Sequence, residues 1–86
     1  MKNKLIDFIL RNGKQGAEEV ETYVDLKTPI DGGSSLEYPM IHQVCYFSDD
    51  NSLFVYCLDE DNNGMFYAFD ELSEDIRNKI SESILP

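Results

Sequence analysis

The spacing of apolar residues at the start of the chain is that of one helix face. It predicts a helix over residues 3–11, with Phe8 at the shoulder of the apolar stripe. Asn12-Gly13 then indicates its end, because both residues tolerate the left-handed turn that commonly closes a helix. The positions that form the stripe are Leu5, Ile6, Ile9 and Leu10.

Between residues 19 and 26 apolar and polar residues alternate, which predicts a strand with one buried and one solvated face. The residues predicted to share the buried face are Val20, Thr22, Val24 and Leu26. Residues 28–35 contain Pro29, Gly32 and Gly33, and this composition predicts a loop.

Two further segments, 40–47 and 53–58, are rich in β-branched and aromatic residues and are predicted to be strands joined by the loop 48–52. The dipeptide Asn63-Gly64 is typical of a tight two-residue hairpin turn, because both residues accept positive φ. We therefore predict a second hairpin that ends with a strand over 65–69.

A two-residue turn at 63–64 fixes the register of this hairpin, with Leu58 opposite Phe69. Tyr56 and Tyr67 then share one face, which leaves them as candidate exposed anchors. In the first hairpin, pairing Phe47 with Leu53 makes Cys45 and Cys57 diagonal neighbours on one face.

The period becomes helical again over residues 71–85, with Asp70 or Ser73 as the capping residue. Its apolar positions are Leu72, Ile76, Ile80 and Ile84. The elements predict a single α+β domain over 1–86, with two layers: a four-stranded, mainly antiparallel sheet and N- and C-terminal helices. Two helices on one side cannot bury both faces of such a sheet.

Charge is strongly segregated in this sequence. The net charge is −10, and the 48 residues from Thr28 to Asp75 contain no lysine or arginine. Like charges this close repel one another, so the field favours solvation, a cation or a basic partner. The carboxylates of this segment are Asp31, Glu37, Asp49, Asp50, Asp59, Glu60, Asp61, Asp70, Glu71, Glu74 and Asp75.

Composition argues against several classes of protein. A pI near 4.2 disfavours direct binding to nucleic acid or to an anionic membrane, since both require clustered basic residues. The apolar run 5–10 is broken by Asp7 and resembles neither a signal peptide nor a membrane span, so we expect a cytoplasmic location. In that compartment Cys45 and Cys57 would be reduced and buried.

The segment 59–70 carries oxygen-bearing side chains at alternate positions. Asp59, Asp61, Asn63 and Asp70 occupy positions 1, 3, 5 and 12 of a calcium loop, and Gly64 occupies position 6. Residues 59–72 thus resemble an EF-hand loop in its dockerin form, which implies calcium as a cofactor. The alternative is an acidic hairpin closed by Asn-Gly, with no cofactor.

Catalysis finds little support in this sequence. His42 and Cys45 lie three residues apart on a strand, so they face opposite sides and do not form a nucleophile–base pair. No zinc-type cysteine spacing, phosphate loop or catalytic triad pattern is present. We therefore predict a protein that is not an enzyme.

The remaining prediction is a protein-interaction domain with an acidic surface and a basic protein partner, and its variants include self-association through a sheet face. Two alternatives stay open: an acidic DNA mimic that occupies a nucleic-acid-binding protein, and an accessory subunit without chemistry of its own. Aromatic side chains rimmed by charge are common at interfaces. The candidate interface residues are Tyr56, Tyr67, Asp49, Asp50 and Glu60.

Overall fold

The computed structural model describes residues 2–16 and 22–86. An N-terminal helix, five strands, a short 3₁₀ helix and a C-terminal helix follow one another along the chain. Their bounds are α1 Lys2–Asn12, β1 Lys14–Gln15, β2 Thr22–Asp31, β3 Met40–Phe47, β4 Ser52–Leu58, β5 Gly64–Ala68, η1 Phe69–Glu71 and α2 Glu74–Ile84.

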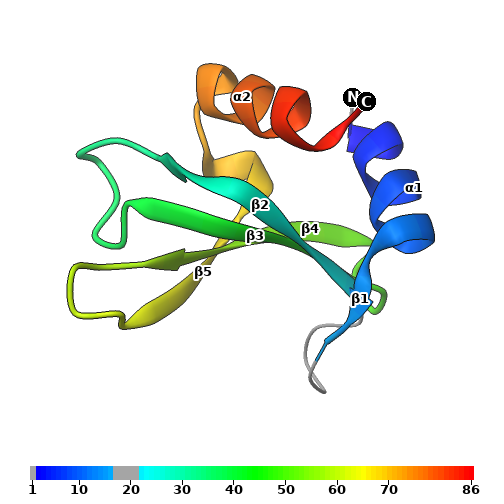
Figure 1. Cartoon of the computed structure of the whole chain (residues 1–86), viewed down its shortest axis with the longest axis horizontal. Helices are drawn as coiled ribbons and strands as arrows, with labels where there is room; N and C mark the ends of the chain where they lie inside the picture. Colours follow the sequence, from blue (N-terminus) through cyan, green and yellow to red (C-terminus); the bar gives the residue numbers. More distant parts are fainter. Residues whose placement is uncertain (1, 17–21) are drawn as a thin grey trace.

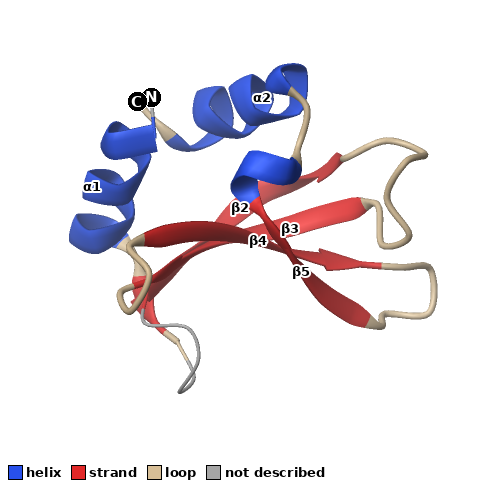
Figure 2. Cartoon of the chain, turned by 180° about the vertical axis from the view of Figure 1, so that it is seen from behind, coloured by secondary structure: helices blue, strands red, loops and turns tan. Residues whose placement is uncertain are grey.

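The strands form one antiparallel sheet in chain order, β1-β2-β3-β4-β5, and both helices lie on the same side of it (Figures 1 and 2). Helix α2 packs mainly on β2, and α1 packs on β2 and β3. The α+β class and the antiparallel sheet are therefore confirmed. The opposite face of the sheet is not covered by either helix.

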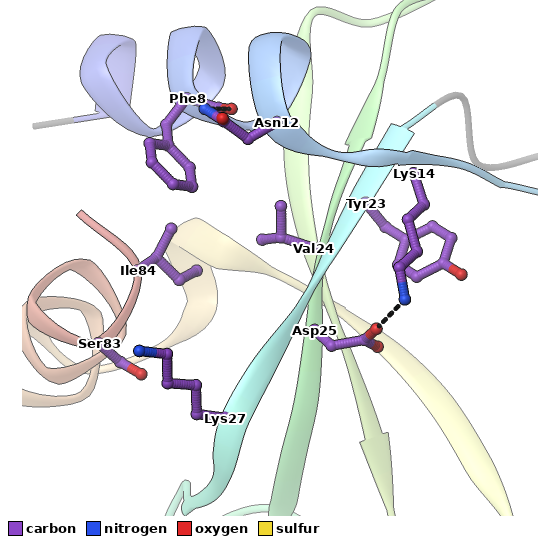
Figure 3. A pocket seen from close by; sticks show the side chains of 9 residues that line it. All are labelled: Phe8, Asn12, Lys14, Tyr23, Val24, Asp25, Lys27, Ser83 and Ile84. Atoms are coloured by element: carbon purple, nitrogen blue, oxygen red, sulfur yellow. Dashed lines mark hydrogen bonds and ion pairs between the residues drawn. The ribbon is translucent and has the colours of Figure 1, made fainter. Parts of the chain in front are cut away.

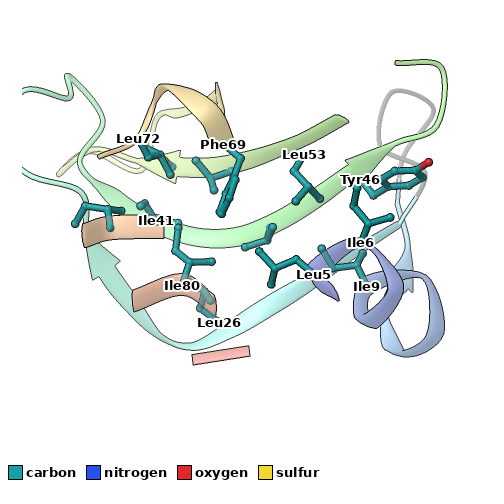
Figure 4. Packing of buried hydrophobic residues seen from close by; sticks show 14 residues of the cluster. Leu5, Ile6, Ile9, Leu26, Ile41, Tyr46, Leu53, Phe69, Leu72 and Ile80 are labelled. Atoms are coloured by element: carbon teal, nitrogen blue, oxygen red, sulfur yellow. The ribbon is translucent and has the colours of Figure 1, made fainter. Parts of the chain in front are cut away.

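The hydrophobic core lies between the two helices and the face of the sheet that they cover (Figure 4). Residues directly opposite each other in antiparallel strands point to the same face, so the register gives complete rows of side chains. One row runs Val24, Val44, Val55, Tyr67 and another runs Ile30, Ile41, Cys57, Met65. From the helices, Leu5, Ile9 and Ile80 reach this face and are fully buried.

A bulge in β3 allows two key core residues to share a face. Ile41 and Val44 lie three positions apart and would point to opposite sides of a regular strand. The pairing passes from Ile41–Cys57 directly to Gln43–Tyr56, so His42 is the extra residue of a β-bulge. As a result both Ile41 and Val44 are fully buried.

Helix α1 ends at Asn12, as the sequence predicts, but Gly13 is needed for a different reason. A Cβ on Gly13 would overlap the Ile9 carbonyl oxygen and the Thr22 side chain, because the end of the helix approaches β2 closely. The backbone of Gly13 does not adopt the positive φ that we expected.

Helix α2 begins later than predicted. Residues 69–71 form η1, and Ser73 caps α2 by accepting a hydrogen bond from the Ile76 amide at 3.3 Å. Of the two predicted caps, Ser73 is therefore the one in use.

The sheet has five strands rather than four. The additional strand, β1, consists of two residues that pair with Tyr23 and Thr22. The predicted loop 28–35 is also partly wrong, since β2 continues through Pro29 to Asp31. Residues 19–21 of the predicted strand lie outside the described residues.

The predicted register of the second hairpin is wrong by five residues. Leu58 lies opposite Gly64 instead of Phe69, and the connection is a loop over 59–63 rather than a two-residue turn. The positive φ falls on Asn62, at 64°, and Phe69 belongs to η1. Because the register differs by an odd number of residues, each side chain of β5 points to the face opposite the predicted one.

Candidate functional site

The uncovered face of the sheet divides into a polar half and an aromatic half. One cross-strand row shows the change directly: Asp25 on β2, Gln43 on β3, Tyr56 on β4 and Phe66 on β5. The hydrogen-bonded polar residues lie toward β1, and the aromatic residues lie toward β5.

Four rings make up the aromatic half, which we call the aromatic cluster: Phe47, Phe54, Tyr56 and Phe66. The ring centroid of Phe47 lies 4.7 Å from that of Phe54 and 5.8 Å from that of Phe66. The ring centroids of Tyr56 and Phe66 are 5.0 Å apart. Aromatic pairs at such distances stabilise one another beyond their buried area. Three of the rings are half-buried, and Phe66 is 38% exposed.

Gly64 makes room for this cluster. It lies beside Tyr56 across the β4–β5 ladder, and a Cβ at position 64 would overlap the Tyr56 hydroxyl and ring. The glycine at this position is therefore explained by packing rather than by turn geometry.

The polar half is organised around Asp25. Its carboxylate accepts hydrogen bonds from the Gln43 amide at 2.9 Å and from the Lys14 ammonium at 3.1 Å. These two donors, Gln43 first, lower the pKa of Asp25, and its carboxylate raises the pKa of Lys14. The charges of this half are thus satisfied within the chain.

Acidic loops lie at both ends of the aromatic cluster. In an antiparallel meander consecutive connections fall at opposite ends of the sheet, so the 48–51 turn and the 59–63 loop are on opposite sides. Asp49 and Asp50 are exposed in the first, and Glu60 and Asp61 are exposed in the second. The exposed carboxylates of these loops therefore form two groups, one at each end of the sheet, with the aromatic cluster between them.

Asp59 holds the second loop in shape. Its Oδ1 accepts hydrogen bonds from the amides of Asp61 and Asn63 at 2.9 and 2.8 Å, and its Oδ2 accepts one from the Asn63 side chain at 3.1 Å. These bonds, led by that from the Asn63 side chain, lower the pKa of Asp59. Both carboxylate oxygens of Asp59 are occupied by the loop itself.

Of the predicted calcium ligands, Asp59, Asp61 and Asn63 lie together in the 59–63 loop, but Asp70 is separated from them. Asp59 and Asp70 lie beyond opposite ends of β5, whose five residues span roughly 17 Å. Asp70 instead forms an ion pair with Lys2 at 2.9 Å. Within residues 2–16 and 22–86 no cluster of three or more metal-ligating side chains is found. Calcium binding at 59–70 stays a prediction without support from the arrangement of its residues.

Tyr67 does not belong to the exposed surface, which corrects the predicted pairing with Tyr56. It points to the helix-covered face, where it packs against the core. Its hydroxyl oxygen accepts a hydrogen bond from the Tyr38 amide at 3.1 Å. Phe66 takes the place beside Tyr56 that we expected for Tyr67. Sequence reasoning missed it because the register of the hairpin was wrong.

The two cysteines lie on opposite faces, so the prediction that they share one face is wrong, because Phe47 pairs with Ser52 rather than with Leu53. Cys45 is opposite Phe54 on the uncovered face, and Cys57 is opposite Ile41 in the core. Both are free, and burial raises the pKa of each thiol to about 12. They are therefore poor nucleophiles at neutral pH.

A groove of about 370 Å³ lies beside β2, between the C-terminal ends of the two helices (Figure 3). Its apolar lining comes from Phe8, Val24 and Ile84, and Lys14 and Lys27 stand at its border. Lys14 is engaged with Asp25, and Lys27 and Ser83 also line the groove.

Comparison with protein-family models, with curated proteins and with solved structures gives no match to this chain. None of the helices that the structure describes has the length and apolar character needed to cross a membrane.

Proposed function

We propose that this chain is a non-enzymatic interaction domain that binds a partner protein through the aromatic cluster. The observation that carries the proposal is the position of that cluster: four packed rings on the sheet face that neither helix covers, with exposed carboxylates at both ends. An apolar centre with a charged rim is the usual composition of a protein interface.

Charge supports one kind of partner over the others. Two copies of a chain with net charge −10 that met face to face would bring acidic loops into a shared interface, where like charges repel. A partner with an apolar patch bordered by lysine or arginine complements both parts of the surface. Basic side chains can also lie over the exposed rings, where cations are attracted to the aromatic face.

The same arrangement argues against a DNA mimic. Such a protein needs carboxylates that continue along one surface in place of a row of phosphates. Here four aromatic rings interrupt the acid between the 48–51 and 59–63 loops. The interaction proposal accounts for the rings, whereas the mimic does not.

The test compares tagged wild-type chain with the variants Tyr56→Ser and Phe54→Ser in affinity capture from cells of the source species. Leu10→Ser is the matched control, because Leu10 is 49% exposed on α1, away from the aromatic cluster. We expect one or more proteins to bind wild type and the control but not the cluster variants, and to bind less as salt rises.

The captured protein is then purified and titrated with each variant. Loss of about tenfold or more in affinity is expected for Tyr56→Ser, since central aromatic residues dominate binding energy. Circular dichroism confirms that the variants remain folded. If folded cluster variants keep every partner of the wild type, or if Leu10→Ser loses the same partners, the proposal is wrong.

A further inference from the structure

One edge of the sheet has unpaired backbone groups. β5 is the last strand in the order, and in the described part of the chain its residues 65–68 make backbone hydrogen bonds only with β4. Every second residue of an edge strand directs its amide and carbonyl groups outward, where they can pair with another strand. This edge borders the aromatic cluster, because Phe66 lies on β5.

β5 lacks most of the features that protect exposed edges. Its sequence, Gly-Met-Phe-Tyr-Ala, has no charged residue and no proline, and its register with β4 is regular. Met65 and Phe66 are exposed hydrophobic side chains. Only its short length limits pairing with another chain.

The opposite side of the sheet makes a useful contrast. Among the described residues the edge strand there, β1, pairs only with Thr22 and Tyr23, so β2 itself forms the edge beyond them. That part of β2 carries Asp25, Lys27, Pro29 and Asp31, and its pairing with β3 is irregular between residues 25 and 30. Charge, proline and irregular register are the usual means of blocking an edge. The β5 edge therefore lacks the charge, proline and irregular register that block strand addition at the β2 edge.

Acidic residues stand at both ends of β5. Asp59, Glu60 and Asp61 precede it, and Asp70 and Glu71 follow it. If two copies paired through β5, parallel or antiparallel, carboxylates would meet at both ends of the new ladder. Self-pairing is therefore opposed by charge, although the strand itself carries none.

We infer that the β5 edge accepts an extended segment of a partner protein, in which a short apolar stretch lies between basic residues. The inference rests on the proposed function and adds the mode of binding. The segment pairs with the outward amides and carbonyls of β5 as an additional strand. Its side chains alternate between the two faces, so every second one lies on the uncovered face, where Phe66 forms the border of the aromatic cluster.

Model peptides test this inference directly. The probe is a short synthetic peptide in which valine and threonine alternate between pairs of lysines, and the charge control has glutamates in place of the lysines. Two further peptides carry equal numbers of N-methyl groups. In one the methyl groups lie on alternate residues and leave one strand edge able to pair, and in the other they lie on adjacent residues and block both edges.

We expect the lysine peptide and the alternately methylated peptide to bind the full chain and to shift the amide resonances of β5. The peptide blocked on both edges should bind at least about tenfold more weakly, because backbone hydrogen bonds are lost. The glutamate peptide should not bind. Magnetic resonance of the labelled protein measures both the affinity and the location.

The inference is overturned if the lysine peptide does not bind at millimolar concentration, if its shifts fall outside β5 and its neighbours, or if both methylated peptides bind alike. These results leave the proposed function standing, since a partner could still bind the aromatic cluster through side chains alone. Conversely, a captured partner that binds Tyr56→Ser as tightly as wild type contradicts the proposed function, and the peptide results do not alter that conclusion.

Discussion

At the scale of single residues, the buried thiols show how one residue type serves two environments. Cys57 fills the core beneath the helices, whereas Cys45 lies on the uncovered face and is still only 1% exposed. Cys45 lies in the cross-strand row of Tyr23 and Phe54, and Asp25 is close enough to help raise its pKa. Cys45 thus behaves as part of the interior although no helix lies above it.

The raised thiol pKa values predict a loss of stability at alkaline pH. Unfolded thiols ionise near pH 9.0, whereas the folded thiols ionise at about 12. The stabilisation is complete below pH 9, and it is lost as pH rises through 9 toward 12, because the unfolded state releases its protons first. Urea unfolding at pH 7 and at about pH 10 measures the change.

The control for this experiment is the double variant Cys45→Ala, Cys57→Ala. It is less stable at neutral pH, because alanine leaves cavities, but its stability should decline less between the two pH values. All other ionisable residues are the same in both proteins. An equal decline in wild type and variant would show that the thiols do not contribute.

At the scale of elements, the start of α2 depends on one hydroxyl group. Ser73 Oγ is the acceptor for the Ile76 amide, which otherwise lacks an intrahelical partner. Replacing Ser73 by alanine should lower the free energy of unfolding by about 1 kcal/mol. Ser83→Ala is the matched control. Ser83 is exposed inside the same helix, and this change should stay within about 0.5 kcal/mol of wild type. Chemical denaturation distinguishes the two, and equal effects would contradict the capping role.

The elements also show how far the sequence could predict the fold. Both helices follow from local periodicity, and the segments of β3 and β4 follow from their content of β-branched and aromatic residues. β1 could not be predicted, because a two-residue strand exists only through its pairing with Thr22 and Tyr23. Its formation depends on contacts that no local pattern encodes.

The second hairpin was mispredicted for a definable reason. Asn63-Gly64 is a common turn signal, but Asp59 accepts three hydrogen bonds from the residues that follow it and so holds a five-residue loop over 59–63. Because the connection is this loop rather than a two-residue turn, Phe66 lies on the uncovered face and Tyr67 packs against the core. Tyr56 lies on the uncovered face and Asp49, Asp50 and Glu60 lie in exposed turns, whereas Tyr67 lies on the covered face.

At the scale of the whole molecule, acidic residues far outnumber basic ones, and the net charge is −10. Ion pairs Lys2–Asp70 and Lys14–Asp25 each use one of the seven basic residues. Both pairs are exposed, so each contributes little by itself. Most of the carboxylates between Thr28 and Asp75 are left to repel one another.

Salt should therefore stabilise the protein. Raising sodium chloride from about 0.02 M to about 0.5 M screens the repulsion and should raise Tm by roughly 4–8 °C, corresponding to about 1 kcal/mol. Calcium and magnesium chloride at equal ionic strength provide the control for a specific site. If both give the same Tm, the effect is screening. A larger rise with calcium alone would instead support the calcium prediction for 59–70.

The order of strands in the sheet is the same as their order in the chain, and this has a consequence for assembly. Each strand pairs with a neighbour in sequence, so the sheet can form by successive short loop closures, the kind of topology that folds quickly. β5 is the last strand of that series along the chain. A partner segment that joins its edge would extend the same sheet beyond the chain itself.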